Sequence, residues 1–160
     1  MFNKKLLEIV KNNFKLDFYG AHGIYHWQRV YKNTQILSTH YKINSPVFEL
    51  FSLFHDSKRE NEYSDIYHGF RASEFVKELL EKKEIILNEN DTNRLLYAIA
   101  NHTISDENNP LFNDLIVQIC FDSDRLDLGR VGIEPEEKYM ITEFGKKLVR
   151  EKKFYWEEEV

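Results

Sequence analysis

His55 and Asp56 stand side by side directly after residues 47–54, the most apolar stretch of the sequence. That stretch predicts a buried helix, and a carboxylate at its C-terminal end faces the negative end of the helix dipole. Burial adds a further cost because the carboxylate loses its hydration. A divalent metal ion would offset both costs, and His and Asp are ordinary ligands for such ions. The dipeptide therefore indicates a metal site at the end of this helix.

A second acidic cluster, residues 122–127 (DSDRLD), follows another apolar stretch, residues 115–121. Two buried helices that each end in carboxylates predict one shared site where the two ends meet. Helical spacing does not decide which carboxylate takes part, because this helix is apolar on almost all sides. Its most buried side lies between Asp122 and Asp127, and Asp124 lies further round.

Three segments together resemble the H…HD…D signature of the HD-domain superfamily: His26 in HWQRV, the pair His55-Asp56, and Asp124 in SDRLD. Members of this superfamily are all-helical, metal-dependent phosphohydrolases. The order and the long gaps match across about residues 20–130, and this combination is far more specific than an HD dipeptide alone. The resemblance implies that His26, His55, Asp56 and Asp124 bind the metal.

The resemblance also gives the final ligand position to Asp124 and leaves Asp122 to orient a ligand or a nearby base. His68 and His102 lie between the HD pair and the final Asp, where two-metal members of the superfamily have two further histidines. In such a site Asp56 would bridge both ions. In a one-metal site His68 and His102 would instead contact phosphate or donate a proton. The implied cofactor is one or two divalent ions per chain, chosen from Mn, Co, Ni, Zn, Mg and Fe.

Lys58 and Arg59 directly follow the metal dipeptide, so we expect them to reach a phosphate above the metal. Several HD hydrolases, including nucleotidases and the stringent-response hydrolases, carry Glu at the third position after the HD Asp. Here that position is Arg59, with Glu60 one step later, so the general base is open between Asp122, Glu60 and a hydroxide formed at the metal. The expected catalytic residues are Asp56, Asp122, Lys58 and Arg59, and the expected substrate-binding residues are Arg29, Arg71, Arg125 and His22.

The elements that must position these residues are predicted to be helices. Glycine (6) and proline (3) are scarce, which disfavours short strands joined by tight turns. Apolar residues recur at helical spacing nearly throughout, so we expect one all-α domain of about six or seven helices over residues 1–160. The expected helices cover residues 2–10, 24–41, 46–54 with Ser45 as the cap, 68–82, a helix from a cap at Asp91 or Thr92 to His102, 111–128, and a last helix from Pro135.

Composition limits the partners. The net charge of −5 argues against binding of extended nucleic acid, which needs clustered Lys and Arg. The single cysteine, Cys120, forms no disulfide within the chain and is expected in the core of a cytoplasmic protein. No stretch approaches the roughly 18 apolar residues of a membrane span. Three adjacent aromatic residues, 154–156, are expected to dock on the domain or, less readily, to form a homodimer contact.

These observations favour a cytoplasmic, metal-dependent phosphohydrolase that acts on a phosphate ester or anhydride, with a small nucleotide as the substrate class by family analogy. Two alternatives stay open. One is a di-iron oxygenase on the same H…HD…H…H…D ligand set, and the other is a non-catalytic module that binds a nucleotide or a metal. Oxygen consumption by redox-active iron would indicate the oxygenase, whereas metal-dependent phosphate release would exclude the module as the whole function.

Overall fold

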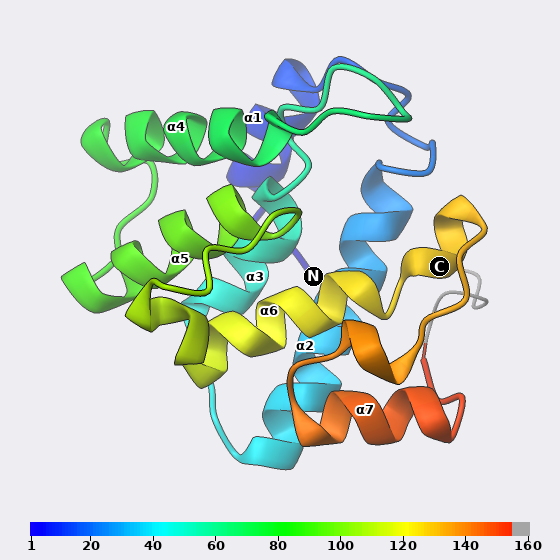
Figure 1. Ribbon diagram of the computed structural model, residues 1–160. Coiled ribbons are helices and arrows are strands. Elements are labelled where there is room, and N and C mark those ends of the chain that lie inside the picture. Colours follow the sequence, from blue (N-terminus) through cyan, green and yellow to red (C-terminus); the bar gives the residue numbers. More distant parts are fainter. Residues whose placement is uncertain (155–160) are drawn as a thin grey trace.

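The computed structural model describes residues 1–154, and this part of the chain contains helices joined by loops, without a strand (Figure 1). The predicted all-α class is confirmed. The α-helices are α1 (Lys4–Asn13), α2 (Ile24–Tyr41), α3 (Pro46–Phe54), α4 (His68–Glu81), α5 (Glu89–Asn101), α6 (Leu115–Arg125) and α7 (Glu143–Arg150). Three short 3₁₀ helices lie between them: η1 (Pro110–Asn113), η2 (Leu128–Val131) and η3 (Glu137–Tyr139).

Helix α3 lies at the centre of the molecule, packed against α2, α5 and α6. Seven of its nine residues are buried, as its apolar composition predicts. Surrounding such a helix with other helices removes the most apolar surface from water, which is the main favourable term in folding. Figure 1 shows α4 and α5 lying side by side, with α6 crossing towards α2. The C-terminal end of α3 therefore opens into the interior, where His55 and Asp56 are fully buried.

The start and end signals in the sequence place several helices correctly. Helix α2 covers residues 24–41 as predicted, and α3 begins at Pro46 with the Ser45 hydroxyl accepting a hydrogen bond from the Val47 amide. The cap of α5 is a correction. Asn88, not Asp91 or Thr92, accepts the hydrogen bond from the Asp91 amide. The true cap therefore lies three residues before Asp91 and four before Thr92.

Two of the expected helices are shorter than predicted. The segment expected as one helix over residues 111–128 is interrupted at Asp114, whose carboxylate accepts hydrogen bonds from the Ile116 and Val117 amides and starts α6. The last helix begins at Glu143 rather than at Pro135, because the Thr142 hydroxyl caps the Gly145 amide. In both places a side-chain cap, which is a local feature, overrides the longer apolar pattern.

The start of α4 is held unusually close to the end of α5. A Cβ atom built on Gly69 would lie 2.6 Å from the Ile99 carbonyl oxygen, a distance that real Cβ atoms do not reach. Only glycine permits this approach of the two backbones. The contact brings His68, the first residue of α4, next to His102, which caps the C-terminal end of α5.

The end of the described chain packs on the body of the protein, where Phe154 contacts the core. The other residues of the aromatic tail, 155 and 156, lie outside the described residues. Cys120 is fully buried, as predicted. Within residues 1–154, no helix is both long enough and apolar enough to cross a lipid bilayer.

Candidate functional site

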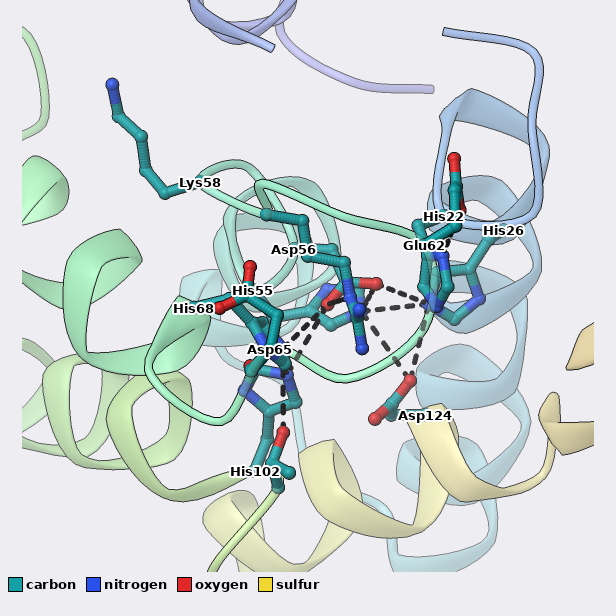
Figure 2. Close-up of polar contacts among 12 residues, drawn as sticks. His22, His26, His55, Asp56, Lys58, Glu62, Asp65, His68, His102 and Asp124 are labelled. Atoms are coloured by element: carbon teal, nitrogen blue, oxygen red, sulfur yellow. Dashed lines mark hydrogen bonds and ion pairs between the residues drawn. The ribbon is translucent and has the colours of Figure 1, made fainter. Parts of the chain in front are cut away.

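Six buried His and Asp side chains meet where five helices end or pass one another (Figure 2). Helix α2 supplies the first histidine, the end of α3 supplies the His-Asp pair, and α6 supplies the last carboxylate. The start of α4 and the end of α5 each supply one more histidine. The ligand-type atoms form two groups of three, and within each group all atoms lie within 4.8 Å of one another. The groups are His26, His55 and Asp124, and Asp56, His68 and His102.

In the first group, two imidazoles and one carboxylate point at the same small volume. His26 Nε2 lies 2.9 Å from His55 Nε2. Asp124 Oδ1 lies 3.3 Å from His26 Nε2 and 3.5 Å from His55 Nε2. These three side chains come from α2, the end of α3 and α6, so the group exists only in the folded protein.

The second group repeats this arrangement with Asp56 as its carboxylate. His68 Nε2 lies 2.8 Å from His102 Nε2, and Asp56 Oδ1 lies 3.1 Å from His68 Nε2 and 3.5 Å from His102 Nε2. The other oxygen, Oδ2, lies 3.5 Å from His26 Nε2 in the first group. Asp56 therefore lies between the two groups and presents one oxygen to each.

In each of the four histidines, the Nδ1 atom, which faces away from the centre, contacts an oxygen atom that can only accept a hydrogen bond. Three of them donate Nδ1–H to backbone carbonyls: His55 to Phe51 at 3.0 Å and Ser52 at 3.1 Å, His102 to Ile99 at 2.7 Å, and His68 to Asp65. The hydrogen-bond network therefore assigns the proton to Nδ1 in each ring. The fourth, His26, donates Nδ1–H to the Asp127 carboxylate at 2.6 Å.

With Nδ1 protonated, each ring directs its Nε2 lone pair inward. The paired Nε2 atoms lie 2.8 to 2.9 Å apart. At this distance their lone pairs repel each other unless a proton or a metal cation lies between the two nitrogens. Asp56 Oδ2 is also buried and accepts no hydrogen bond from the described residues. Imidazole nitrogens and carboxylate oxygens are a normal donor set for Zn, Mn, Fe and related ions. The residues present therefore fit a divalent metal.

Electrostatics around the two groups favour a positive charge at the centre. Burial and the charge of Arg130 lower the pKa of His26, but contacts with Asp124, Asp127 and Asp56 outweigh them and raise it to about 9. Burial raises the pKa of Asp56, but the nearby His55 and the contacts with other histidines hold it well below its usual range. The carboxylates around His26 therefore favour a positive charge at this position.

Of three comparisons with known proteins, one found a similar protein, and it supports the fold. No protein-family model matches the chain, and no curated protein sequence matches it. The structure is similar to the crystal structure of a predicted HD superfamily hydrolase from an uncultured Thermotogales bacterium, with a TM-score of 0.69. The two sequences are 26% identical, and the match covers 92% of this chain and 83% of the other chain. The chain has an HD-domain fold.

Within this HD domain, Asp122 does not have the orienting position expected for it. Its carboxylate is buried and accepts hydrogen bonds from the Ile141 amide and from the amide and hydroxyl of Thr142. It therefore holds the start of α7 and neither faces the site nor orients a ligand. Asp127 has the orienting position instead, because its two oxygens bind His26 Nδ1 at 2.6 Å and Arg29 Nε at 2.7 Å.

Lys58, expected to reach a phosphate, and Glu60, one of the candidates for the general base, make their contacts away from the two groups. The Lys58 side chain extends outward in Figure 2, and its Nζ lies 4.2 Å from the centre of the Phe75 ring. Glu60 is half exposed and pairs with Lys15 at 3.3 Å. Neither side chain lines the pocket described below.

Arg29 and Arg71, expected to bind substrate, hold other parts of the site in place. Arg29 pairs with Asp127, behind the His26 ring. Arg71 forms an ion pair of 2.6 Å with Asp65 and donates to the Lys58 carbonyl at 3.0 Å, which fixes the loop between α3 and α4. Both guanidinium groups lie outside the pocket lining, so the structure does not bring these two residues to the pocket.

A pocket of about 800 Å³ lies above the two groups. Of the residues expected to contact the substrate, Arg59, Arg125 and His22 line it. Sequence reasoning missed Arg130 and Glu62, which also line it. Glu62 binds His22 Nδ1 at 2.5 Å across 40 residues of sequence. Both missed residues lie in loops or 3₁₀ turns, where no periodic pattern in the sequence indicates the direction of a side chain.

Proposed function

We propose that this protein is a metal-dependent phosphohydrolase that acts on a phosphate ester or anhydride. One observation carries the proposal. Four histidines have their outer nitrogens fixed by acceptors, and their inner nitrogens converge with Asp56 and Asp124 beneath a pocket lined by arginines. A structural role alone does not account for six buried polar groups whose lone pairs face each other.

The residues that would hold the metal are His26, His55, Asp56, His68, His102 and Asp124. A divalent ion held by these residues supplies Lewis acidity, which lowers the pKa of water and polarises a phosphoryl oxygen. The rest of the chemistry falls to the residues of the pocket. Arg59 and Arg125 present guanidinium donors to non-bridging phosphate oxygens, where charge grows in the transition state.

We propose His22 and Glu62, which line the pocket and contact each other, as its acid–base pair, in place of Asp122 and Glu60, which do not line it. Burial lowers the pKa of His22, although the nearby Asp56 and the bond to Glu62 partly oppose this. A histidine with a lowered pKa is neutral near pH 7. With Nδ1 donating to Glu62, its Nε2 is then free to accept a proton from water or to return one to the leaving group.

We propose a small nucleotide as the substrate class. A volume of about 800 Å³ is within the range of pockets that hold such ligands. The pocket lining combines cations such as Arg130 with apolar side chains, namely those of Leu128, Val131 and Ile133. This combination suits a molecule with an anionic end and a flat organic end. The net charge of −5 makes the local cations more informative than they would be in a basic protein.

The test begins with elemental analysis of untagged protein prepared without added metal. About one or two divalent ions per chain are expected in the wild type and should be lost in Asp56→Asn. His40→Gln is the matched control, since His40 stacks on Phe144 at 3.7 Å, outside both groups, and the variant should keep its metal. A wild type that contains no metal and cannot be loaded by dialysis would refute the proposal.

Phosphate release is then measured with mono-, di- and triphosphate nucleosides, pyrophosphate and a phosphodiester. Metal-dependent release that is lost in Asp56→Asn supports the hydrolase. Bound iron with oxygen consumption and no phosphate release would indicate the oxygenase alternative. Bound metal with neither activity would leave a binding module as the function.

A further inference from the structure

Each carboxylate of the centre has its own guanidinium neighbour. Arg59 Nε lies 3.4 Å from Asp56 Oδ1, and Arg130 Nη2 lies 3.4 Å from Asp124 Oδ1. The two arginines come from different parts of the chain, one after α3 and the other in η2, and both line the pocket. The arrangement places one guanidinium beside each of the two metal-ligand groups.

Arg130 is buried but has too few acceptors for its donors. Only 8% of its side chain is exposed. Of its five N–H groups, one on Nη1 donates to the Asp127 carbonyl at 2.8 Å, and one on Nη2 makes the long 3.4 Å bond to Asp124. Its Nε has no hydrogen-bond partner among residues 1–154. Leaving donors of a buried cation unsatisfied is costly, so an acceptor for the remaining Nη protons is expected in the pocket.

Asp124 alone is a poor partner for this charge. Its Oδ1 already lies close to two histidine nitrogens, and a ligand carboxylate shares its negative charge with the metal. The pocket lining as a whole contains four cations and three anions, and two of the anions are ligand candidates. The cations are Arg59, Arg125, Arg130 and Lys138, and the anions are Asp56, Glu62 and Asp124.

We propose that Arg130 binds a non-bridging oxygen of the substrate phosphoryl group from the Asp124 side, opposite Arg59, so that the two guanidiniums form an anion clamp. The Asp127 carbonyl fixes the guanidinium plane of Arg130, and the Asn61 carbonyl, at 3.0 Å from Nη1, fixes that of Arg59. Fixed guanidiniums bind phosphate with little loss of side-chain entropy. This inference rests on the proposed phosphohydrolase function.

The electrostatics of His22 are consistent with the clamp. Burial lowers the pKa of His22 most, and the charges of Arg59 and Arg130 lower it further. The geometry agrees, because Asp56 Oδ2 and Asp124 Oδ1 lie 3.5 and 3.3 Å from the same His26 Nε2. The two guanidiniums therefore stand beside neighbouring carboxylates and line one pocket.

The alternative role for Arg130 is purely structural support of the Asp127 turn. A variant of Arg29 distinguishes support of Asp127 from phosphate binding. Arg29 also binds Asp127, with its Nε 2.7 Å from Oδ1, but it lies outside the pocket lining. Loss of either arginine should disturb Asp127 and weaken metal binding. Only loss of Arg130 should weaken the binding of phosphate once the metal site is saturated.

The experiment measures binding of inorganic phosphate by isothermal titration calorimetry at saturating metal. The variants are Arg130→Met, which keeps the apolar stem, Arg130→Lys, which keeps the charge, and Arg29→Lys. Metal content and the unfolding midpoint are recorded for each. We expect phosphate binding about 10- to 100-fold weaker in Arg130→Met, the effect of losing charge-assisted hydrogen bonds. Arg130→Lys should lose less, and Arg29→Lys should stay within about threefold of the wild type.

The outcomes separate this inference from the proposed function. If folded, metal-loaded Arg130→Met binds phosphate as the wild type does, the clamp is refuted even when the wild type hydrolyses phosphate esters. If Arg29→Lys loses phosphate binding as strongly as the Arg130 variants, Arg130 is structural and the clamp is also refuted. A third outcome is a wild type that binds phosphate but hydrolyses no phosphate compound. If only Arg130→Met then loses phosphate binding, Arg130 is shown to bind phosphate and the hydrolase proposal fails.

Discussion

Replacing Asp127 by asparagine tests how the histidine ligands are oriented. The substitution keeps the shape of the side chain and removes one negative charge. Both carboxylate oxygens are in use, since Oδ2 accepts from His26 Nδ1 at 2.6 Å and Oδ1 accepts from Arg29 Nε at 2.7 Å. Asparagine offers one acceptor oxygen, so its NH₂ group must face one of these two donors. One charge-assisted hydrogen bond is lost, and the asparagine NH₂ group then faces the N–H of either His26 or Arg29.

The expected magnitudes follow from these two contacts. Asp127 is fully buried, so water does not replace the lost acceptor. A hydrogen bond to a charged group contributes about 1.5–3 kcal/mol, so the free energy of unfolding should fall by about that amount. For a chain of this size the corresponding fall in Tm is about 4–10 °C. Removing the acceptor that orients a histidine ligand typically costs about 10- to 100-fold in metal affinity.

Asp122→Asn is the matched control. Asp122 is another fully buried carboxylate near the end of α6, and it also accepts several hydrogen bonds, but from Ile141 and Thr142 rather than from a ligand. This variant should lose a similar amount of stability, about 1–3 kcal/mol. Its metal affinity should stay close to that of the wild type, because no contact joins Asp122 to either ligand group.

Urea denaturation of metal-free protein gives the free energy of unfolding, and competition with a chromogenic chelator gives the metal affinity. The two variants should agree in the first quantity and differ in the second. Wild-type metal affinity in Asp127→Asn would refute the argument that Asp127 orients His26. A loss of metal affinity in Asp122→Asn as large as that in Asp127→Asn would show that general destabilisation, rather than orientation, is being measured.

Three further changes test other parts of the structure. Lys58→Ala should alter kcat/KM by less than about twofold, because its ammonium lies over Phe75, and steady-state kinetics would check this. Gly69→Ala should destabilise the protein by about 1–3 kcal/mol, since its Cβ would lie 2.6 Å from the Ile99 carbonyl oxygen, and calorimetric melting would measure this. It should also weaken metal binding at the neighbouring His68, which a metal titration would measure. The pKa of His26 is raised from 6.5 to about 9, so folding of the metal-free protein is favoured by protonation of this ring. That contribution is complete below pH 6.5 and is lost as the pH rises through about 9, and urea titrations across this range should show a decline that metal-loaded protein does not share.

Local signals in the sequence determined the fold class and most of the helices. The apolar spacing of residues 24–41 and the Ser45-Pro46 start specify α2 and α3 directly, because capping and periodicity act over a few residues. The same short range explains the errors. Asp114 and Thr142 cap their helices through side-chain hydrogen bonds, and the spacing of apolar residues does not show which candidate cap forms them.

The sequence also indicated which residues could form the site, through the resemblance that joins His26, the His55-Asp56 pair and Asp124. The structure brings these residues together with His68 and His102. Periodicity left Asp122, Asp124 and Asp127 unresolved, since all three stand at the end of one helix that is buried on nearly every side.

Only the tertiary structure decided which way each of these side chains points. Asp127 lies beyond the last turn of α6, where the backbone leaves the helix and turns its carboxylate towards His26. Arg130 reaches the pocket because η2 folds back over Asp124, whereas Lys58 is drawn outward by the Phe75 ring. These directions depend on contacts between residues far apart in the chain. Local propensity carries no information about such contacts, so the sequence indicated which His and Asp residues come together but not the residues that contact them from behind or line the pocket above them.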